Sequence, residues 1–309
     1  MKDVLLEYVM KVDAYAPTPS ASTAYIRKVL CVVKPKGETK DTITECTETA
    51  EVEALTDAKI GKLLDAGMTS ILVLPVDDLS GLKTIIEASN KKFFTILIDG
   101  AFGNSAVSGA DLSFFAGVVG WCAEEQSEAK AFTIQRSNVG FVDASSNSSQ
   151  NMYWAFGKLL SANSWKNQQY IEMPFASGID NIGKAELAFE NAVSFVLTSE
   201  EYGNRLGLFA SNRRAIIAPY VYEEIQLKLQ SKALQYISLN QPNYTEAEAS
   251  LLEDSLQAVI DAYIEDGIIT NGSVSVTLSD EQFVANATIQ IPEPKALWRI
   301  RATMQQGEI

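Results

Sequence analysis

Histidine is absent from the 309-residue chain. This absence excludes Ser-His-Asp and Cys-His activation of a nucleophile, zinc sites built on histidine, and acid–base catalysis by an imidazole. An enzyme of this composition would have to use carboxylates, lysine, tyrosine or a magnesium ion. The composition therefore favours a protein without catalytic activity.

Cysteine is scarce, and long apolar runs are missing. The three cysteines, Cys31, Cys46 and Cys122, have spacings that match no metal-binding or redox motif. We interpret them as reduced structural residues of a cytosolic protein. The beginning of the chain shows no apolar segment with a cleavage site, so we expect no export signal. No stretch approaches about eighteen consecutive apolar residues, so we expect no membrane partner.

Positive charge is also in deficit. The chain has 25 lysines and arginines against 39 acidic residues, a formal net charge of −14. Nucleic-acid binding requires clustered lysine and arginine to neutralise phosphates, so the composition disfavours a nucleic-acid partner. An acidic surface otherwise indicates solubility and points to no particular ligand.

The middle of the chain alternates apolar strand-like segments with helical ones. The predicted strands are Ser70–Val76, Phe93–Ile98, Phe114–Trp121 and Val139–Val142, and the predicted helices include Thr56–Ala66, Leu79–Ser89, Glu124–Ile134, Gln150–Leu160 and Gly183–Leu197. This alternation is typical of an α/β layer with a mixed, largely parallel sheet. We place this α/β body at residues 38–240.

Residues 241–294 are predicted to form an α+β unit, a long helix followed by a β-hairpin. In the helix Thr245–Asp266, Thr245 and Glu248 have the spacing of a capping box, and one face of the helix is apolar. Apolar and polar residues then alternate in Gly272–Leu278 and in Phe283–Ile291. This period of two predicts a pair of half-buried strands.

Both ends of the chain carry strand-like segments beyond these units. An N-terminal arm, predicted over residues 1–37, contains the continuous apolar run Val29–Val33. At the other end, Pro292 and Pro294 interrupt the sheet because proline has no N–H to donate. Residues 295–309 follow, with the alternating segment Leu297–Thr303. A strand separated in this way from its hairpin is suited to pair with its own sheet or with the sheet edge of a neighbouring subunit.

Arginines near the end of the chain are candidates for contacts between subunits. The residues concerned are Arg205, Arg213, Arg214, Arg299 and Arg301. In so acidic a chain they are suited to meet carboxylates of a neighbour and to select the partner. Trp298 is a candidate interface anchor. Alternatively, the arginines form a solvent-exposed face and Trp298 is a core residue.

Asp77, Asp78, Asp99 and Asp143 each follow a predicted strand. Ligands of an open α/β sheet bind at the carboxyl ends of its strands, so Asp99 and Asp143 are candidates to hold magnesium in a phosphotransferase or hydrolase. The alternative is that they are turn and helix-capping residues. Neither a Gly-x-Gly-x-x-Gly motif nor a P-loop follows these strands, and the sequence predicts no cofactor.

The order of elements resembles that of contractile phage tail sheath proteins and the related sheaths of injection systems. The resemblance is carried by the strand Tyr25–Val33, the α/β body, the segment Asn212–Arg214, the helix and hairpin Thr245–Ile291 and the terminal strand Leu297–Thr303. It is most specific over residues 200–309. It implies a structural subunit of a virion tail, assembled in the host cytoplasm into a helical tube around a tail tube. The implied partners are further copies of the chain, the tail tube protein, and baseplate and tail terminator proteins.

In that family, terminal strands extend to adjacent subunits and add to their sheets. By position, the resemblance assigns this linking role to Val29, Cys31 and Val33 near the N-terminus and to Leu297, Trp298, Arg299, Ile300 and Arg301 near the C-terminus. Two other hypotheses stand beside it: the magnesium-dependent enzyme, and another tail component such as a tube or baseplate protein. A tube protein would more often be a compact β-barrel, which the predicted helix content disfavours.

Overall fold

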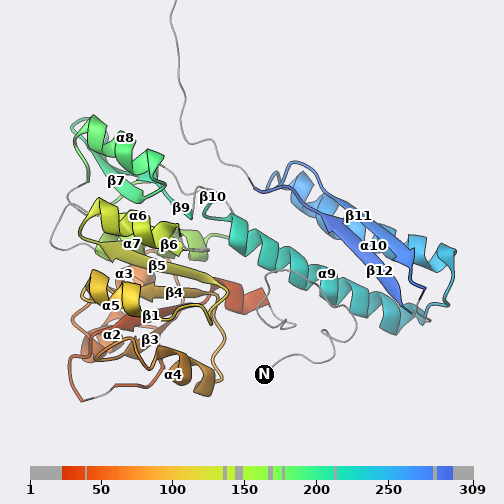
Figure 1. Ribbon diagram of the computed structural model, residues 1–309, viewed down its shortest axis with the longest axis horizontal. Coiled ribbons are helices and arrows are strands. Elements are labelled where there is room, and N and C mark those ends of the chain that lie inside the picture. Colours follow the sequence, from red (N-terminus) through yellow and green to blue (C-terminus); the bar gives the residue numbers. More distant parts are fainter. Residues whose placement is uncertain are drawn as a thin grey trace, which may run out of the picture.

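A computed structural model of the protein describes residues 23–38, 40–134, 138–142, 149–165, 170–175, 178–211, 214–280 and 284–294. The described chain forms an α/β body from which a long helix leads to a smaller helix–hairpin unit (Figure 1). Every helix in these ranges is either too short or too polar to cross a bilayer.

An eight-stranded sheet forms the centre of the body, in the order β2-β3-β1-β4-β5-β6-β7-β8. The strands are β1 (Val29–Val33), β2 (Thr44–Cys46), β3 (Ile71–Pro75), β4 (Thr95–Ile98), β5 (Val118–Ala123), β6 (Asn138–Val142), β7 (Ser194–Ser199) and β8 (Gly203–Leu208). The six interior strands, from β3 through β1 to β7, are parallel to one another, while β2 and β8 are antiparallel edge strands. The predicted mixed, largely parallel sheet is confirmed.

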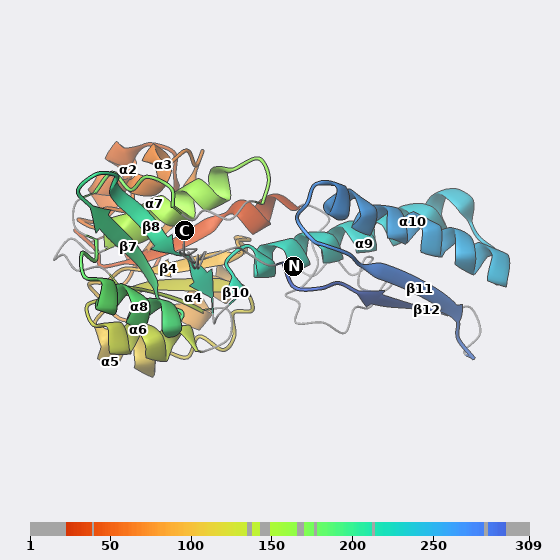
Figure 2. The ribbon, with the colours of Figure 1, turned by 90° about the horizontal axis from the view of Figure 1, so that it is seen from above.

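Helices cover both faces of this sheet (Figure 2). On one face lie α2 (Thr49–Leu55), α3 (Lys62–Asp65) and α7 (Ser149–Ser161), and on the other lie α4 (Leu82–Ala88), α5 (Asn104–Gly109), α6 (Gln126–Thr133) and α8 (Ile182–Glu190). Strand residues alternate between the two apolar layers: Cys31 packs in the first, and Leu30 and Val32 in the second. Burial on both faces explains why the strand sequences read as continuous apolar runs.

The structure corrects the linking role predicted for Val29, Cys31 and Val33. Strand β1 has no free edge, because Cys31 lies opposite Val73 of β3 on one side and Leu97 of β4 on the other. All three residues are fully buried. A continuous apolar run is typical of a central parallel strand, whereas a strand added to a neighbour needs a free edge in both chains. Residues 29–33 therefore belong to the body and not to an arm over residues 1–37.

Two predicted helices also differ from the structure. The helix predicted over Gly183–Leu197 stops at Glu190, and its last residues form the start of β7. Ala192 adopts a left-handed backbone conformation, with φ of 57°, which ends a helix, and the β-branched and aromatic residues that follow favour a strand. The helix predicted over Thr56–Ala66 is reduced to α3, and a further helix, α2, precedes it.

The helix–hairpin unit follows the prediction closely. Helix α9 (Ala218–Asn240) leaves the body, and α10 (Glu246–Glu265) packs against it. The Thr245 side chain caps α10 by accepting a hydrogen bond from the backbone N–H of Glu248 (3.3 Å). Strands β11 (Ser273–Leu278) and β12 (Ala285–Gln290) form the predicted antiparallel hairpin. The remaining elements are the 3-10 helix η1 (Thr23–Arg27) and the short pair β9 (Ala210–Ser211) and β10 (Arg214–Ala215).

One apolar core joins the body to this unit. The layer that contains Cys31 of β1 continues through Ile225 of α9 to Ile260 of α10 and Val274 of β11. The helix–hairpin unit is therefore connected to the body by the packed helix α9 and not by a flexible linker.

Close packing of β6 on α6 provides a test of the sheet. A methyl group at Gly140 would lie 2.1 Å from the carbonyl oxygen of Ala129, a backbone atom that has no rotamer to move away. We expect Gly140→Ala to lower the free energy of unfolding by about 1–3 kcal/mol, measured by urea denaturation. The control is Gly109→Ala at the end of α5, where no described atom lies within 4 Å. It should leave the stability unchanged or raise it by up to about 1 kcal/mol; equal losses in both variants would contradict the packing.

Candidate assembly surface

The β11–β12 hairpin presents an incomplete sheet. Val274 and Val276 of β11 are buried, and α10 packs against this strand. On the same face of the hairpin, Ile289 and Ala287 of β12 lie directly opposite them. Strand β12 is nevertheless largely exposed, including Ala285 and Ala287. Helix α10 thus covers β11 and leaves Ala285 and Ala287 of β12 exposed, while Ile289 is half-buried against the core.

No described residue pairs with the outer edge of β12, which stands as the edge of a two-stranded sheet. An open edge strand carries unpaired backbone N–H and C=O groups and is a template for pairing with another chain. Two-stranded hairpins are also only marginally stable without further strands or a packed helix. The exposed β12 edge is the feature of the described surface that best fits a docking site for an extended segment.

The helix–hairpin unit is uniformly acidic. No lysine or arginine occurs between Lys232 and Lys295, whereas acidic residues stand at Glu246, Glu248, Glu253, Asp254, Asp261, Glu265, Asp266, Asp280, Glu281 and Glu293. Among them, Asp254, Asp261 and Glu265 lie on the exposed side of α10, with the small Ala258 between them. This side of α10 suits a positively charged surface that approaches closely.

Helix α9 fixes the unit to the body through a buried aromatic contact. The ring of Tyr220 stacks on Trp165, with 5.1 Å between the ring centroids, and meets the edge of Phe94 at 5.4 Å. Its hydroxyl group lies 2.8 Å from the Thr95 hydroxyl of β4. Both polar atoms are satisfied in the core, so the first turn of α9 is held in one orientation on the sheet.

The next turn of α9 contacts η1, the first described element of the chain. Tyr25 of η1 donates a hydrogen bond from its hydroxyl to the Glu223 carboxylate, which is only 5% exposed. Burial raises the pKa of Glu223 to about 7, and the hydrogen bond from Tyr25 opposes this shift only in part. Arg27, two residues further, lies over the Trp165 ring at 4.0 Å. The hydrogen bond between Tyr25 and Glu223 therefore fixes η1 onto α9.

Glu224 ties α9 to α10. Its carboxylate accepts hydrogen bonds from the Tyr263 hydroxyl of α10 (2.9 Å) and from the Trp165 indole, and it forms an ion pair with Lys228 (2.8 Å). Burial alone would raise the pKa of Glu224, but the hydrogen bonds from Lys228 and Trp165 outweigh burial and hold the pKa below its usual value. One carboxylate thus links the body, α9 and α10.

The strand-end aspartates do not assemble a catalytic site in the described chain. Asp99 is 8% exposed and accepts hydrogen bonds from the Tyr153 hydroxyl (2.6 Å) and from the Ala101 backbone (2.8 Å). It holds α7 against the end of β4. Asp77 pairs with Lys40 (2.6 Å), while Asp143 lies outside the described residues. Within the described ranges, no cluster of three or more acidic or cysteine residues is placed to hold a metal ion.

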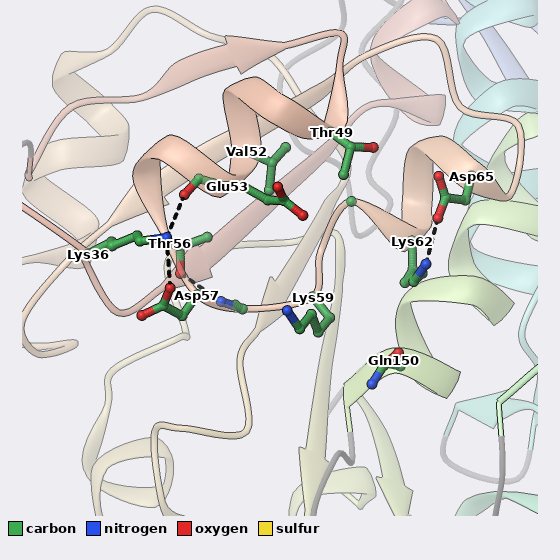
Figure 3. Close-up of a pocket in the computed structure, with 12 residues that line it drawn as sticks. Lys36, Thr49, Val52, Glu53, Thr56, Asp57, Lys59, Lys62, Asp65 and Gln150 are labelled. Atoms are coloured by element: carbon green, nitrogen blue, oxygen red, sulfur yellow. Dashed lines mark hydrogen bonds and ion pairs between the residues drawn. The ribbon is translucent and has the colours of Figure 1, made fainter.

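A cavity of about 480 Å³ lies elsewhere, between α2, α3 and the start of α7 (Figure 3). Lys36 is paired there with Asp57 (3.0 Å), and Lys62 with Asp65 (2.8 Å). Asp99 does not line this cavity. Two of its ammonium groups are already neutralised, so the cavity gives the enzyme hypothesis no additional support.

The predicted interface residues fall in two groups. Val29, Cys31 and Val33 are core residues, as described above, whereas Leu297, Trp298, Arg299, Ile300 and Arg301 lie outside the described residues. Arg205 binds within its own chain, to the Tyr202 carbonyl (2.9 Å) and to Glu172 (3.8 Å). Arg213 also lies outside the described residues. No sequence motif marks the β12 edge as a site, and the only indication in the sequence is that the run Ala285–Thr288 lacks large apolar residues.

The fold defines the chain as an α/β body that carries a helix–hairpin extension, and solved structures share this arrangement. A chain of the anti-feeding prophage (AFP) baseplate, solved by cryo-electron microscopy, matches 97% of this chain and 98% of its own length, with a TM-score of 0.67 and 13% identity. Two crystal structures of sheath tail proteins also match. The protein from Listeria innocua has a TM-score of 0.52 at 12% identity, covering 95% of this chain and 98% of its own.

The sheath tail protein from Desulfitobacterium hafniense has a TM-score of 0.51 at 9% identity, covering 92% of this chain and all of its own. No family profile and no curated protein sequence matches the chain. The likeness spans more than nine-tenths of the chain in each case. It confirms the resemblance to tail sheath proteins at the level of the fold.

The Glu223–Tyr25 contact predicts how stability depends on pH. The pKa of Glu223 is raised above its unfolded value, so the folded chain keeps this proton while the unfolded chain releases it. The free energy of unfolding should fall as the pH rises from about 4.5 to about 7, by on the order of 2–3 kcal/mol. Glu223→Gln cannot ionise but keeps an oxygen for Tyr25. Its stability relative to the native chain should therefore rise between pH 5 and pH 8 in urea denaturation.

The control for this measurement is Glu87→Gln, at an exposed position of α4. Its stability relative to the native chain should be the same at both pH values within about 0.5 kcal/mol. A difference for Glu223→Gln that does not change with pH would show that Glu223 is already ionised in the folded protein at pH 5.

Proposed function

We propose that the protein is a structural subunit of a contractile tail sheath, without catalytic activity, that assembles into a helical tube around a tail tube. The observation that carries this proposal is the open, exposed edge of β12 in a chain that shares the fold of sheath tail proteins. A repeating contact between a donated strand and this edge uses different surfaces of the two subunits. Such heterologous contacts build open helical assemblies when the rotation between subunits does not close a ring.

The donated strand is the terminal segment of a neighbouring copy. Its apolar residues, Leu297 aside, alternate with arginines, so Trp298 and Ile300 occupy one face of an extended strand and Arg299 and Arg301 the other. Beside β12, the face with Trp298 and Ile300 extends the apolar face that α10 leaves uncovered at Ala285 and Ala287.

The arginines then occupy the opposite, polar face of the hairpin. Residues there include Ser275, Thr277, Asn286 and Thr288, which alternate with the apolar set. This assignment excludes a shift of the donated strand by one residue. Such a shift would bring Arg299 and Arg301 onto the apolar face and expose Trp298. Backbone hydrogen bonds supply affinity, and the alternating side chains supply specificity.

In this proposal, the acidic side of α10 contacts the enclosed tail tube. Asp254, Asp261 and Glu265 would face basic residues of the tube protein, and the small Ala258 between them permits close approach. Baseplate and tail terminator proteins would contact the ends of the assembled sheath. Assembly takes place in the host cytoplasm, and the product is part of the virion tail. No observation favours the alternative of a magnesium-dependent phosphotransferase or hydrolase.

The donor strand can be tested by removing its ability to pair. Proline at position 300 lacks the N–H group and disrupts an added strand, so we expect Ile300→Pro to raise the concentration required for polymerisation by about tenfold or more. Deletion of residues 295–309 should abolish polymerisation. Both variants should remain folded monomers, because the proposal places this segment on the sheet of a neighbouring subunit. Light scattering and thermal unfolding measure the two properties, and Ile300→Val, which keeps the N–H and the β-branched shape, is the control.

Unfolding of the chain on deletion of residues 295–309 would contradict the proposal, because the terminal strand would then belong to the subunit's own core. Normal polymerisation of Ile300→Pro would contradict it as well.

A further inference from the structure

The loop between α10 and β11 contains the only Asn-Gly pair of the sequence, Asn271–Gly272. It lies after Glu265, where α10 ends, and before Ser273, where β11 begins. The Asn271 side chain is exposed. The pair therefore lies outside the regular hydrogen bonding of both elements, at the point where the hairpin is attached to the helix.

The peptide group that joins Asn271 to Gly272 is accessible to a reaction within the chain. Among the described residues, neither the Asn271 side chain nor the Gly272 N–H has a hydrogen-bond partner. The nitrogen that follows an asparagine can attack the carbonyl carbon of the asparagine side chain when it is deprotonated and sterically unhindered. Glycine has no side chain to shield this nitrogen or to restrict the backbone. The pair therefore has the geometry that this attack requires.

The following peptide group, in contrast, is held by α10. The Gly272 carbonyl accepts a hydrogen bond from the Gln257 side-chain amide (3.3 Å), and the Gln257 oxygen accepts one from the Val274 N–H (2.8 Å). A Cβ atom at Gly272 would lie only 2.6 Å from Cγ2 of Ile260, so α10 packs closely against this backbone. Any lengthening of the backbone before Gly272 would disturb these contacts.

The pair Asn163–Ser164 provides a matched reference within the same chain. Both of its residues are exposed and lie just after α7, outside any helix or strand. The serine side chain hinders its own backbone nitrogen, whereas the glycine after Asn271 does not. The asparagines Asn181 and Asn204 are less suited to react because their side chains are hydrogen-bonded. Asn271 thus combines exposure, a glycine neighbour and the lack of a described partner.

From this geometry we propose that Asn271 is a site of spontaneous covalent modification, at which the Gly272 nitrogen closes a ring onto the Asn271 side chain. A bond forms between the Gly272 nitrogen and Cγ of Asn271, and the bond between Cγ and Nδ2 breaks. The proton of the attacking nitrogen leaves with Nδ2 as ammonia. Water then opens the cyclic imide at either carbonyl and gives aspartate or isoaspartate. Nothing is oxidised or reduced, and the reaction does not depend on the proposed function.

The isoaspartate product changes the attachment of the hairpin. Its main chain passes through the former side chain, which adds one carbon atom to the backbone before Gly272. This displaces Gly272 from Ile260 and from Gln257, so the hydrogen bond between Gln257 and Val274 is weakened. Both products also add a negative charge to a unit that is already uniformly acidic.

The reaction can be followed in the full-length protein, aged in mildly alkaline and in mildly acidic buffer and analysed by proteolysis and peptide mass spectrometry. We expect the peptide with Asn271 to gain the mass of an acid in place of an amide and to separate into aspartate and isoaspartate forms. Conversion should be faster at the alkaline pH and faster than at Asn163. Asn271→Gln, whose longer side chain closes a ring far more slowly, is the control and should remain unmodified.

Two results would overturn the modification site. One is conversion of Asn271 in the urea-unfolded chain but not in the folded chain, because the fold would then protect the pair. The other is conversion at Asn163 ahead of Asn271 in the folded protein.

The effect on the hairpin can be measured by amide hydrogen exchange in the separated isoaspartate fraction. We expect the Val274 amide to exchange at least about fivefold faster than in the unmodified protein, because its hydrogen bond to Gln257 is lost. Freshly purified Asn271→Asp, which carries the charge on a normal backbone, is the control and should keep the slow rate. Equal rates in the isoaspartate fraction and in Asn271→Asp would contradict this effect. The proposed tail sheath role rests on the shared fold and the β12 edge, so these failures are distinguishable from its own.

Discussion

The attachment of α9 to the body is the contact on which the rest of the structure depends. Tyr220 is buried between Trp165 and Phe94, and the carboxylates of Glu223 and Glu224 hold η1 and α10 onto the same two turns of the helix. Burying two adjacent carboxylates is unfavourable unless each is hydrogen-bonded, and here both are. The result is a packed and hydrogen-bonded connection between the body and the helix–hairpin unit.

The described chain divides into a body whose sheet is covered by helices and an extension, the helix–hairpin unit, with an exposed strand edge. In the body, β1 is paired on both sides and helices cover both faces of the sheet. In the extension, no described residue pairs with the outer edge of β12, and Ala285 and Ala287 beside it are exposed. Exposed edges favour aggregation, and natural proteins protect them. Here Glu253 and Gln257 of α10 bind backbone N–H groups of β11, whereas no described side chain binds those of β12, as expected for an edge that another chain completes.

Much of the fold could be predicted from the sequence, because period-two alternation marks the hairpin, an apolar face and a capping box mark helix α10, and continuous apolar runs mark most strands of the sheet. The errors have physical causes. The family resemblance assigns a linking role to Val29–Val33 by position, but an apolar run near a terminus fits either a donated strand or a central one, and only tertiary pairing distinguishes them. The exposed β12 edge could not be predicted, since alternation indicates a half-buried strand without showing how far α10 covers it. The Glu253 and Gln257 contacts join residues about twenty positions apart through the fold, and no local pattern marks them.

The most direct test of the central claim is a cryo-electron microscopy map of the polymer formed by the full-length protein. We expect a helical tube in which a third strand, contributed by a neighbouring subunit's residues 295–309, lies beside β12. A closed ring, or a terminal segment that pairs with β12 of its own subunit, would contradict assembly by strand donation.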